Sequence, residues 1–130
     1  QLGLLAGGGL LGADAGAQMQ TFAAVRILPF LNVVADATQG YSSNSHRSGS
    51  GVGLELALGG LSIGGSGTAT LERWRYPCGG RYAAVHLGGS FHGRYTMDIT
   101  RRFFVAAQAR GVGNADGIEA TFSLGGGVSL

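Results

Sequence analysis

The last fourteen residues, 117–130, alternate between apolar and small or polar side chains without a break. The first set is Ile118, Ala120, Phe122, Leu124, Gly126, Val128 and Leu130. The other set consists of glycine, serine, threonine and one glutamate, with no large apolar residue. Because successive side chains of a β-strand point to opposite faces, a period of two predicts a strand with one apolar face. The segment is long enough for the roughly 9 to 11 residues with which a tilted strand crosses a bilayer.

The same alternation recurs upstream in 21–37, 51–59, 61–72, 81–97 and 103–110. This makes six readable strands, whereas single-chain membrane barrels begin at eight. Two further strands would arise if 21–37 splits near Pro29, which is unwelcome inside a β-ladder, and if 2–11 is itself a strand. A barrel shared between several copies would also resolve the count. We predict an all-β fold, an antiparallel up-and-down transmembrane barrel of about eight strands, with an interior only wide enough for side chains.

The scarcity of charge decides which face of the strands points outward. Charged residues make up 12% of the chain, against about 25% in soluble domains, and 26 of its 130 residues are glycine. A soluble barrel exposes a charged face to water, but here the polar face is mostly glycine, serine and threonine. We therefore expect the few charges to pair inside the lumen. The expected network is Arg26, Glu55, Glu72, His86, Arg94, Arg110 and Glu119. A soluble exported barrel that binds an apolar ligand, like a lipocalin, is the alternative.

The first seventeen residues stand apart from the rest. The run 2–11 (LGLLAGGGLL) is apolar on both alternating faces, and Ala15-Gly16-Ala17 has the small-x-small pattern found before a signal-peptidase site. Two interpretations are open: a signal-like segment 1–17 ahead of a barrel formed by 18–130, or a strand or ordered segment of the barrel itself. Both imply that the chain is exported.

The segments between the strands suggest a membrane topology. Residues 38–50, 73–80 and 113–116 are predicted to be outer loops, 38–50 being the main one for contacts with partners, and short periplasmic turns are expected at 59–60 and 98–100. Aromatic residues near the strand ends are candidates for the girdles found at membrane interfaces. They are Trp74, Tyr76 and Tyr82 at one end, and Tyr95 and Phe103 at the other.

The C-terminus carries a family resemblance. Ser123, Gly125, Val128 and Leu130 occupy the polar, glycine, apolar and terminal apolar positions of a pattern similar to the C-terminal assembly signal of bacterial outer-membrane proteins. The departure is Leu130, where that family most often has phenylalanine. The resemblance is to the outer-membrane protein A-like and X-like small barrels. It implies a location in the outer membrane of a Gram-negative bacterium, contact with outer-membrane lipid and insertion by the barrel-assembly machinery. The further partner could be a second copy of the chain, in a homo-oligomer, or another envelope protein, and both alternatives stay open.

The sequence contains no nucleophile elbow, phosphate-binding loop or zinc-binding helix motif that would indicate catalysis. Some barrels of this class are lipid A deacylases or acyltransferases, and Ser90 and His92 could form a serine-histidine-acid set with Glu72. We favour hydrogen bonding within the lumen for these residues, and therefore a structural or surface-interaction role without enzyme activity. The lone Cys78 offers neither a disulfide nor a metal site, so no metal or cofactor is expected. The nine basic residues form no basic stripe, which argues against a nucleic-acid partner.

Overall fold

The computed structural model describes residues 1–11, 14–75, 80–114 and 117–130. These residues form eight β-strands in chain order. The strands are β1 (Leu2–Leu11), β2 (Asp14–Leu28), β3 (Leu31–Ser42), β4 (Ser45–Leu58), β5 (Leu61–Arg75), β6 (Arg81–Asp98), β7 (Phe103–Asn114) and β8 (Gly117–Val128). No helix long and apolar enough to cross a bilayer occurs in the described part of the chain.

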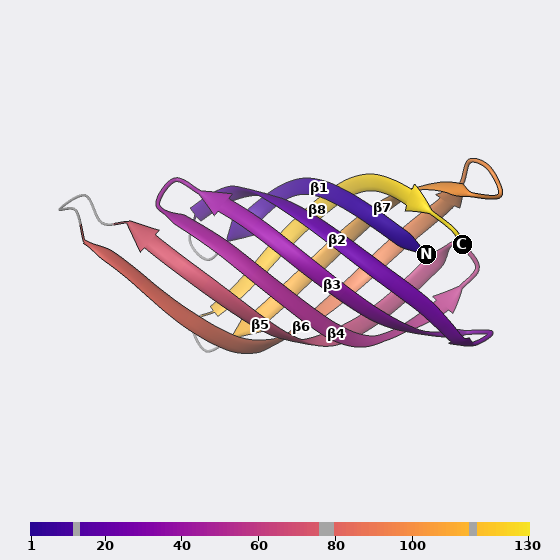
Figure 1. The fold of residues 1–130 in the computed structure, drawn as a ribbon, viewed down its shortest axis with the longest axis horizontal. Coiled ribbons are helices and arrows are strands. Elements are labelled where there is room, and N and C mark those ends of the chain that lie inside the picture. Colours follow the sequence, from indigo (N-terminus) through magenta and orange to yellow (C-terminus); the bar gives the residue numbers. More distant parts are fainter. Residues whose placement is uncertain (12–13, 76–79, 115–116) are drawn as a thin grey trace.

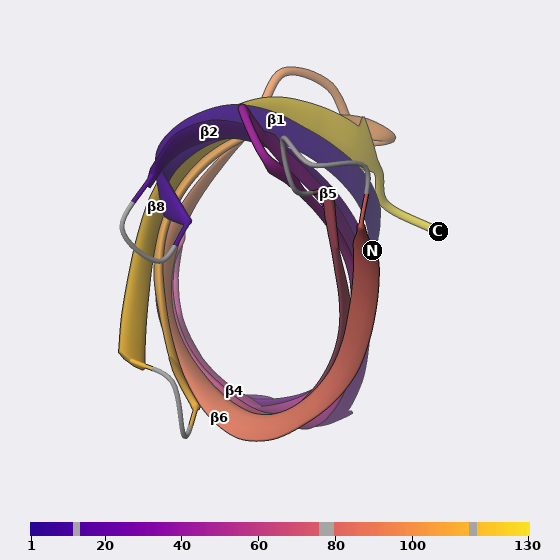
Figure 2. The same ribbon diagram turned by 90° about the vertical axis from the view of Figure 1, so that its left-hand side faces the viewer.

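Each strand is antiparallel to the next, and β1 pairs with β8 to close the ring (Figures 1 and 2). The closing register joins Leu2 to Val128 and Leu10 to Ala120. Closure leaves no first or last strand with a free edge around the ring, which is a requirement for β-structure in lipid, and on β6 only residues 81–87 extend beyond the pairing with β7. The predicted antiparallel up-and-down barrel is confirmed, and one chain provides all eight strands.

The two strands that the alternation leaves uncertain are both present. Leu2–Leu11 is β1, and residues 14–17 already belong to β2, so both described parts of the segment 1–17 belong to the barrel. Pro29 and Phe30 form the turn between β2 and β3, where the missing proline N–H interrupts no ladder. The segment 21–37 is therefore two strands.

The distal end of the barrel, which we define as the end opposite both termini, differs from the expectation. The prediction of a long outer loop at 38–50 is wrong, because β3 and β4 stay paired to Tyr41 and His46 and only Ser43 and Asn44 form the turn. Likewise, residues 73–75 belong to β5 and 113–114 to β7. Backbone pairing satisfies these peptide groups whatever the polarity of the side chains, so a polar composition alone did not distinguish a loop from a strand.

The interior has an apolar plug at the proximal end, which we define as the end carrying both termini. The buried residues there are Leu5, Phe22, Ala24, Val34, Phe104 and Ala106. Phe104, a large apolar residue on the lumen face of β7, packs with its ring centroid 6.2 Å from that of Phe22. Among the described residues, the other buried side chains are polar or charged.

Candidate functional site: a lumen closed by ion pairs

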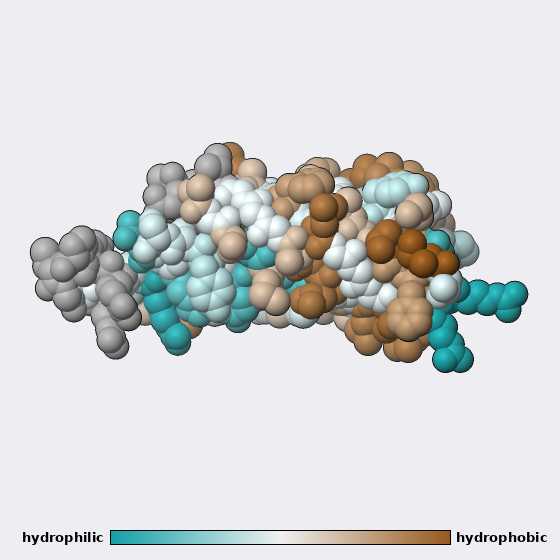
Figure 3. All heavy atoms as spheres, turned by 90° about the horizontal axis from the view of Figure 1, so that it is seen from above, coloured by the Kyte–Doolittle hydropathy of each residue, from teal (hydrophilic) through white to brown (hydrophobic). Residues whose placement is uncertain are grey.

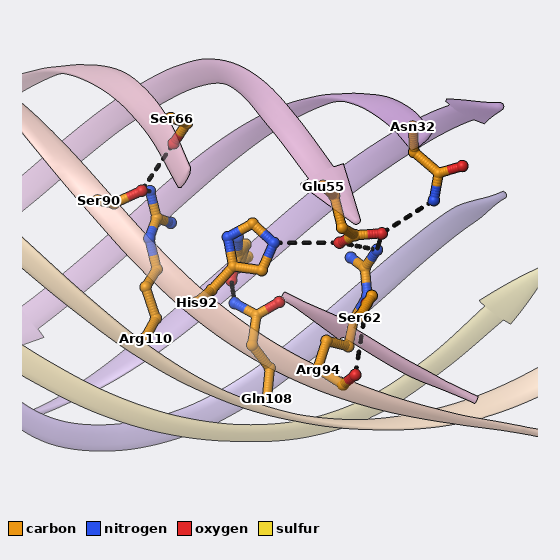
Figure 4. Close-up of polar contacts among 10 residues, drawn as sticks. Asn32, Glu55, Ser62, Ser66, Ser90, His92, Arg94, Gln108 and Arg110 are labelled. Atoms are coloured by element: carbon orange, nitrogen blue, oxygen red, sulfur yellow. Dashed lines mark hydrogen bonds and ion pairs between the residues drawn. The ribbon is translucent and has the colours of Figure 1, made fainter. Parts of the chain in front are cut away.

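The proximal cluster, which consists of Asn32, Glu55, His92 and Arg94, lies next to the apolar plug (Figure 4). One Arg94 nitrogen, Nη2, donates to both oxygens of Glu55, at 2.7 and 2.5 Å. His92 Nε2 lies 3.1 Å from the same carboxylate, and Asn32 donates to it at 3.0 Å. The Arg94 guanidinium also lies 3.9 Å from the centroid of the Phe22 ring, a cation–π distance. Side chains from three strands, β3, β4 and β6, thus meet at one buried carboxylate.

The central cluster surrounds Arg110. Its guanidinium donates to Asp36 at 3.0 Å and to the Ser90 hydroxyl at 3.3 Å. Ser90 and Ser66 share a hydrogen bond of 2.6 Å across β5 and β6. This cluster closes the middle of the lumen.

A hydrogen bond also crosses the lumen directly. The Gln108 side chain on β7 donates to that of Gln20 on β2 at 2.7 Å, and both are buried. A buried amide pair of this kind further fills the interior with satisfied polar groups.

The distal cluster is centred on Arg47. Its side chain donates to Glu72 at 2.6 Å and forms a second ion pair with Glu119, so one cation holds two carboxylates from different strands. His86 Nε2 lies 3.8 Å from Glu72. The cavity between the distal and central clusters measures about 30 Å³. Such a volume holds about one or two waters and no larger solute.

Most of the network predicted from the sequence lies in the lumen. Glu55, Arg94 and His86 lie in or beside the clusters described above, together with Glu72, Arg110 and Glu119. Arg26 does not join them, because it lies exposed at the proximal end, beyond the apolar plug. The prediction missed Arg47, which fell in the presumed loop. It also missed Asp36, which shares the parity of Asn32 and could have been included on that ground.

The serine-histidine-acid set is not assembled. The Ser90 hydroxyl contacts Ser66 and Arg110, while His92 is bound to Glu55 and Glu72 to Arg47. Among the described residues, no group of three or more histidine, cysteine or acidic side chains is arranged to hold a metal. Cys78 lies outside the described residues. These serine, histidine and acidic side chains are instead part of the hydrogen bonds and ion pairs that fill the lumen.

No protein-family model matches the sequence, and no curated protein matches it. Solved structures do. Neisserial surface protein A matches with a TM-score of 0.73 at 12% identity, over 99% of this chain and 95% of the other. The N-terminal barrel domain of Pseudomonas aeruginosa OprF matches at 0.68 and 13%, over 98% and 95%. Ail, the attachment invasion locus protein of Yersinia pestis, matches at 0.64 and 10%, over 98% and 93%. The chain has the fold of the small bacterial outer-membrane β-barrels.

The wall of the barrel is apolar on its outer side. Exposed on β4 are Val52, Leu54, Leu56 and Leu58, and Leu87 on β6 is 76% exposed. Figure 3 shows apolar side chains gathered over the half of one face toward the termini, with paler and hydrophilic ones toward the distal end. The soluble lipocalin-like alternative requires the reverse arrangement, and the structure contradicts it. An apolar belt around a barrel of this fold is the arrangement required of strands that face lipid.

The aromatic residues divide between the two ends. Tyr95 and Phe103 are exposed at the proximal end, as an interfacial girdle requires. Trp74 and Tyr82 lie at the distal end but on the parity of the lumen residues, where Trp74 makes an edge contact with His86, with ring centroids 6.0 Å apart. Tyr76 lies outside the described residues.

The four residues of the C-terminal pattern lie along or just beyond β8. Ser123 is buried in the lumen, and Gly125 lies where an added Cβ would overlap the Leu4 carbonyl oxygen of β1. Val128 pairs with both Leu2 and Phe103, and Leu130 follows the strand and is exposed. The pattern thus runs along the seam where the barrel closes.

Proposed function

We propose that the protein is an integral barrel of the outer membrane of a Gram-negative bacterium, with a closed lumen and no catalytic activity, that acts through its distal surface. The observation that carries this proposal is the closure of the lumen by the three ion-paired clusters. A barrel blocked along its axis and embedded in lipid along its wall has only its two ends left for interaction.

We assign the distal end to the outside of the cell. Outer-membrane barrels have short turns on the periplasmic side, and the end carrying the termini has two-residue turns at 29–30 and 59–60, so this end is assigned to the periplasm. The β5–β6 hairpin, with strands of 15 and 18 residues, then projects outward. This is longer than the roughly 9 to 11 residues that cross a bilayer. The names of two proteins with this fold, a surface protein and an attachment protein, agree with such a role.

The proposed partners follow from this orientation. Outer-membrane lipid surrounds the wall, and the barrel-assembly machinery inserts the chain through the β8 pattern. The ring closes within one chain, so a monomer suffices for the membrane barrel. A second copy or another envelope protein would bind at the distal end.

The test combines folding and conductance. The detergent-folded protein is compared before and after boiling by electrophoresis in dodecyl sulfate, then reconstituted in a planar bilayer. We expect a mobility shift on boiling and no sustained single-channel current. A monomer that remains soluble without detergent would contradict the membrane assignment, steady porin-like currents would contradict the closed lumen, and a multiple-chain band would reveal a homo-oligomer.

A further inference from the structure

A cavity of about 500 Å³ opens at the distal end, beside the turn between β3 and β4. It arises because the strands differ in length: β4 begins at Ser45, opposite Trp74, whereas β5 and β6 remain paired as far as Arg75 and Arg81. The β5–β6 hairpin therefore extends beyond its neighbours, as Figure 1 shows. The cavity lies where the β3–β4 turn meets this projecting wall.

Two aromatic pairs line the cavity. Tyr41 and His46 are stacked with centroids 4.6 Å apart, and His46 is bound through Nε2 to Gln39 at 3.0 Å. Trp74 and Tyr82 lie 5.4 Å apart, and the edge contact with His86 holds Trp74 from the lumen side. These contacts fix the rings before any ligand arrives, which lowers the entropic cost of binding.

The electrostatics of the cavity favour an anion. Arg73 lines it, is exposed, and forms no ion pair with any carboxylate among the described residues. Its cross-strand neighbours, His46 on β4 and Ala83 on β6, carry no negative charge. The adjacent Glu72 points to the lumen and is bound to Arg47. A free guanidinium suits a carboxylate, phosphate or sulfate group, which it binds through paired hydrogen bonds.

The remaining lining is polar. The hydroxyls of Ser42 and Ser45 lie 2.9 Å apart, and Asn44 completes this side. The two hydroxyls bind each other, but each oxygen has capacity for a further hydrogen bond that an apolar ligand would not use, and a cationic ligand would meet Arg73. A ligand with a flat, weakly polar ring face, several hydroxyls and a negative group can contact the aromatic rings, the serine and asparagine side and Arg73.

We propose that this distal cavity binds an anionic saccharide, whose acidic group pairs with Arg73 on the outer face of β5 and whose rings extend across the rim to the Trp74 and Tyr82 faces on the lumen side. This assignment rests on the proposed function, because it requires the distal end to face the outside. The same chemistry occurs in the phosphorylated sugar headgroup of outer-leaflet lipid and in free acidic glycans.

The test uses Trp74 as its own reporter, since it is the only tryptophan of the chain. The full-length protein, folded in detergent and verified by its mobility shift on boiling, is titrated with three probes while tryptophan emission is followed. The probes are trigalacturonate, the phosphorylated glucosamine disaccharide obtained by deacylating lipid A, and neutral maltotriose. The variants are Arg73→Gln and, as a matched control, Arg101→Gln, which removes an exposed arginine at the proximal end.

We expect saturable emission changes with at least one acidic probe, binding at least tenfold weaker in Arg73→Gln, and no change in Arg101→Gln. Saturation by the phosphorylated disaccharide alone would assign the cavity to neighbouring lipid, and saturation by trigalacturonate would assign it to free glycans. Equal binding of maltotriose, or no saturation by a protein that shows the mobility shift, would overturn the ligand assignment and leave the membrane barrel intact. Absence of the mobility shift would overturn both.

Discussion

Arg94 on β6 and Glu55 on β4 form a doubly hydrogen-bonded ion pair in which the two residues are 2% and 1% exposed. His92 and Asn32 share the same carboxylate, so its removal would leave Arg94 without its partner inside the barrel. A buried ion pair of this kind does not by itself ensure stability, because the desolvation of both charges offsets their attraction. Its loss on one side only is the costly change.

We therefore expect Glu55→Gln to lower the free energy of unfolding by about 3–5 kcal/mol, the usual cost of leaving one buried charge unpaired. Urea unfolding in phospholipid vesicles measures this. The double variant Glu55→Leu with Arg94→Met removes both charges and should recover most of the loss. A double variant as unstable as the sum of its two single changes would show that the pair is not coupled.

Leu54→Arg tests the lipid-facing wall. Leu54 is exposed in the middle of the apolar run 52–58, so an arginine there should destabilise the vesicle-inserted barrel by about 2–4 kcal/mol. Ser48 lies on the same face of β4 but in its polar distal part, so Ser48→Arg should lower the free energy of unfolding by no more than about 1 kcal/mol. Equal effects of the two changes would contradict the position of the apolar belt.

Gly53→Ala tests how closely the strands approach inside the ring. An added Cβ at Gly53 would overlap the backbone carbonyl oxygen of Gly65, whereas one at Gly67 would meet nothing within 4 Å. We expect Gly53→Ala to lower the free energy of unfolding by about 1–3 kcal/mol through overpacking, and Gly67→Ala to leave it almost unchanged. The fraction that shows the mobility shift after refolding measures the difference. Similar refolding yields would mean that the wall can relax at Gly53.

Ser90→Ala and His92→Ala separate a lumen role from catalysis. Cells that express either variant should have the same lipid A mass spectrum as cells that express the unchanged protein. Both variants should be less stable, because Ser90 binds Arg110 and His92 binds Glu55. A lipid A modification that appears with the unchanged protein and disappears in both folded variants would reinstate the enzyme alternative.

The sequence by itself determined which side chains face lipid and which face the lumen. Leu54 and Glu55 are adjacent yet lie on opposite sides of the wall, and the period of two that separates them is a property of the extended backbone. With the low charge content, this alternation was enough to predict a barrel with a polar interior. Pro29 marked the division between β2 and β3 for the equally local reason that it lacks an N–H.

Only the tertiary structure decided which interior groups meet. Arg110 reaches Asp36, 74 positions away in the chain, and Arg47 bridges Glu72 and Glu119 from strands that do not adjoin each other. The stagger between strands sets the height of each inward residue along the barrel axis, and closure of the ring sets which residue faces it across the lumen. The ion pairs depend on both. The distal cavity likewise results from the unequal lengths of paired strands. Strand length depends on backbone hydrogen bonding between distant segments, which the composition of 38–50 does not reveal.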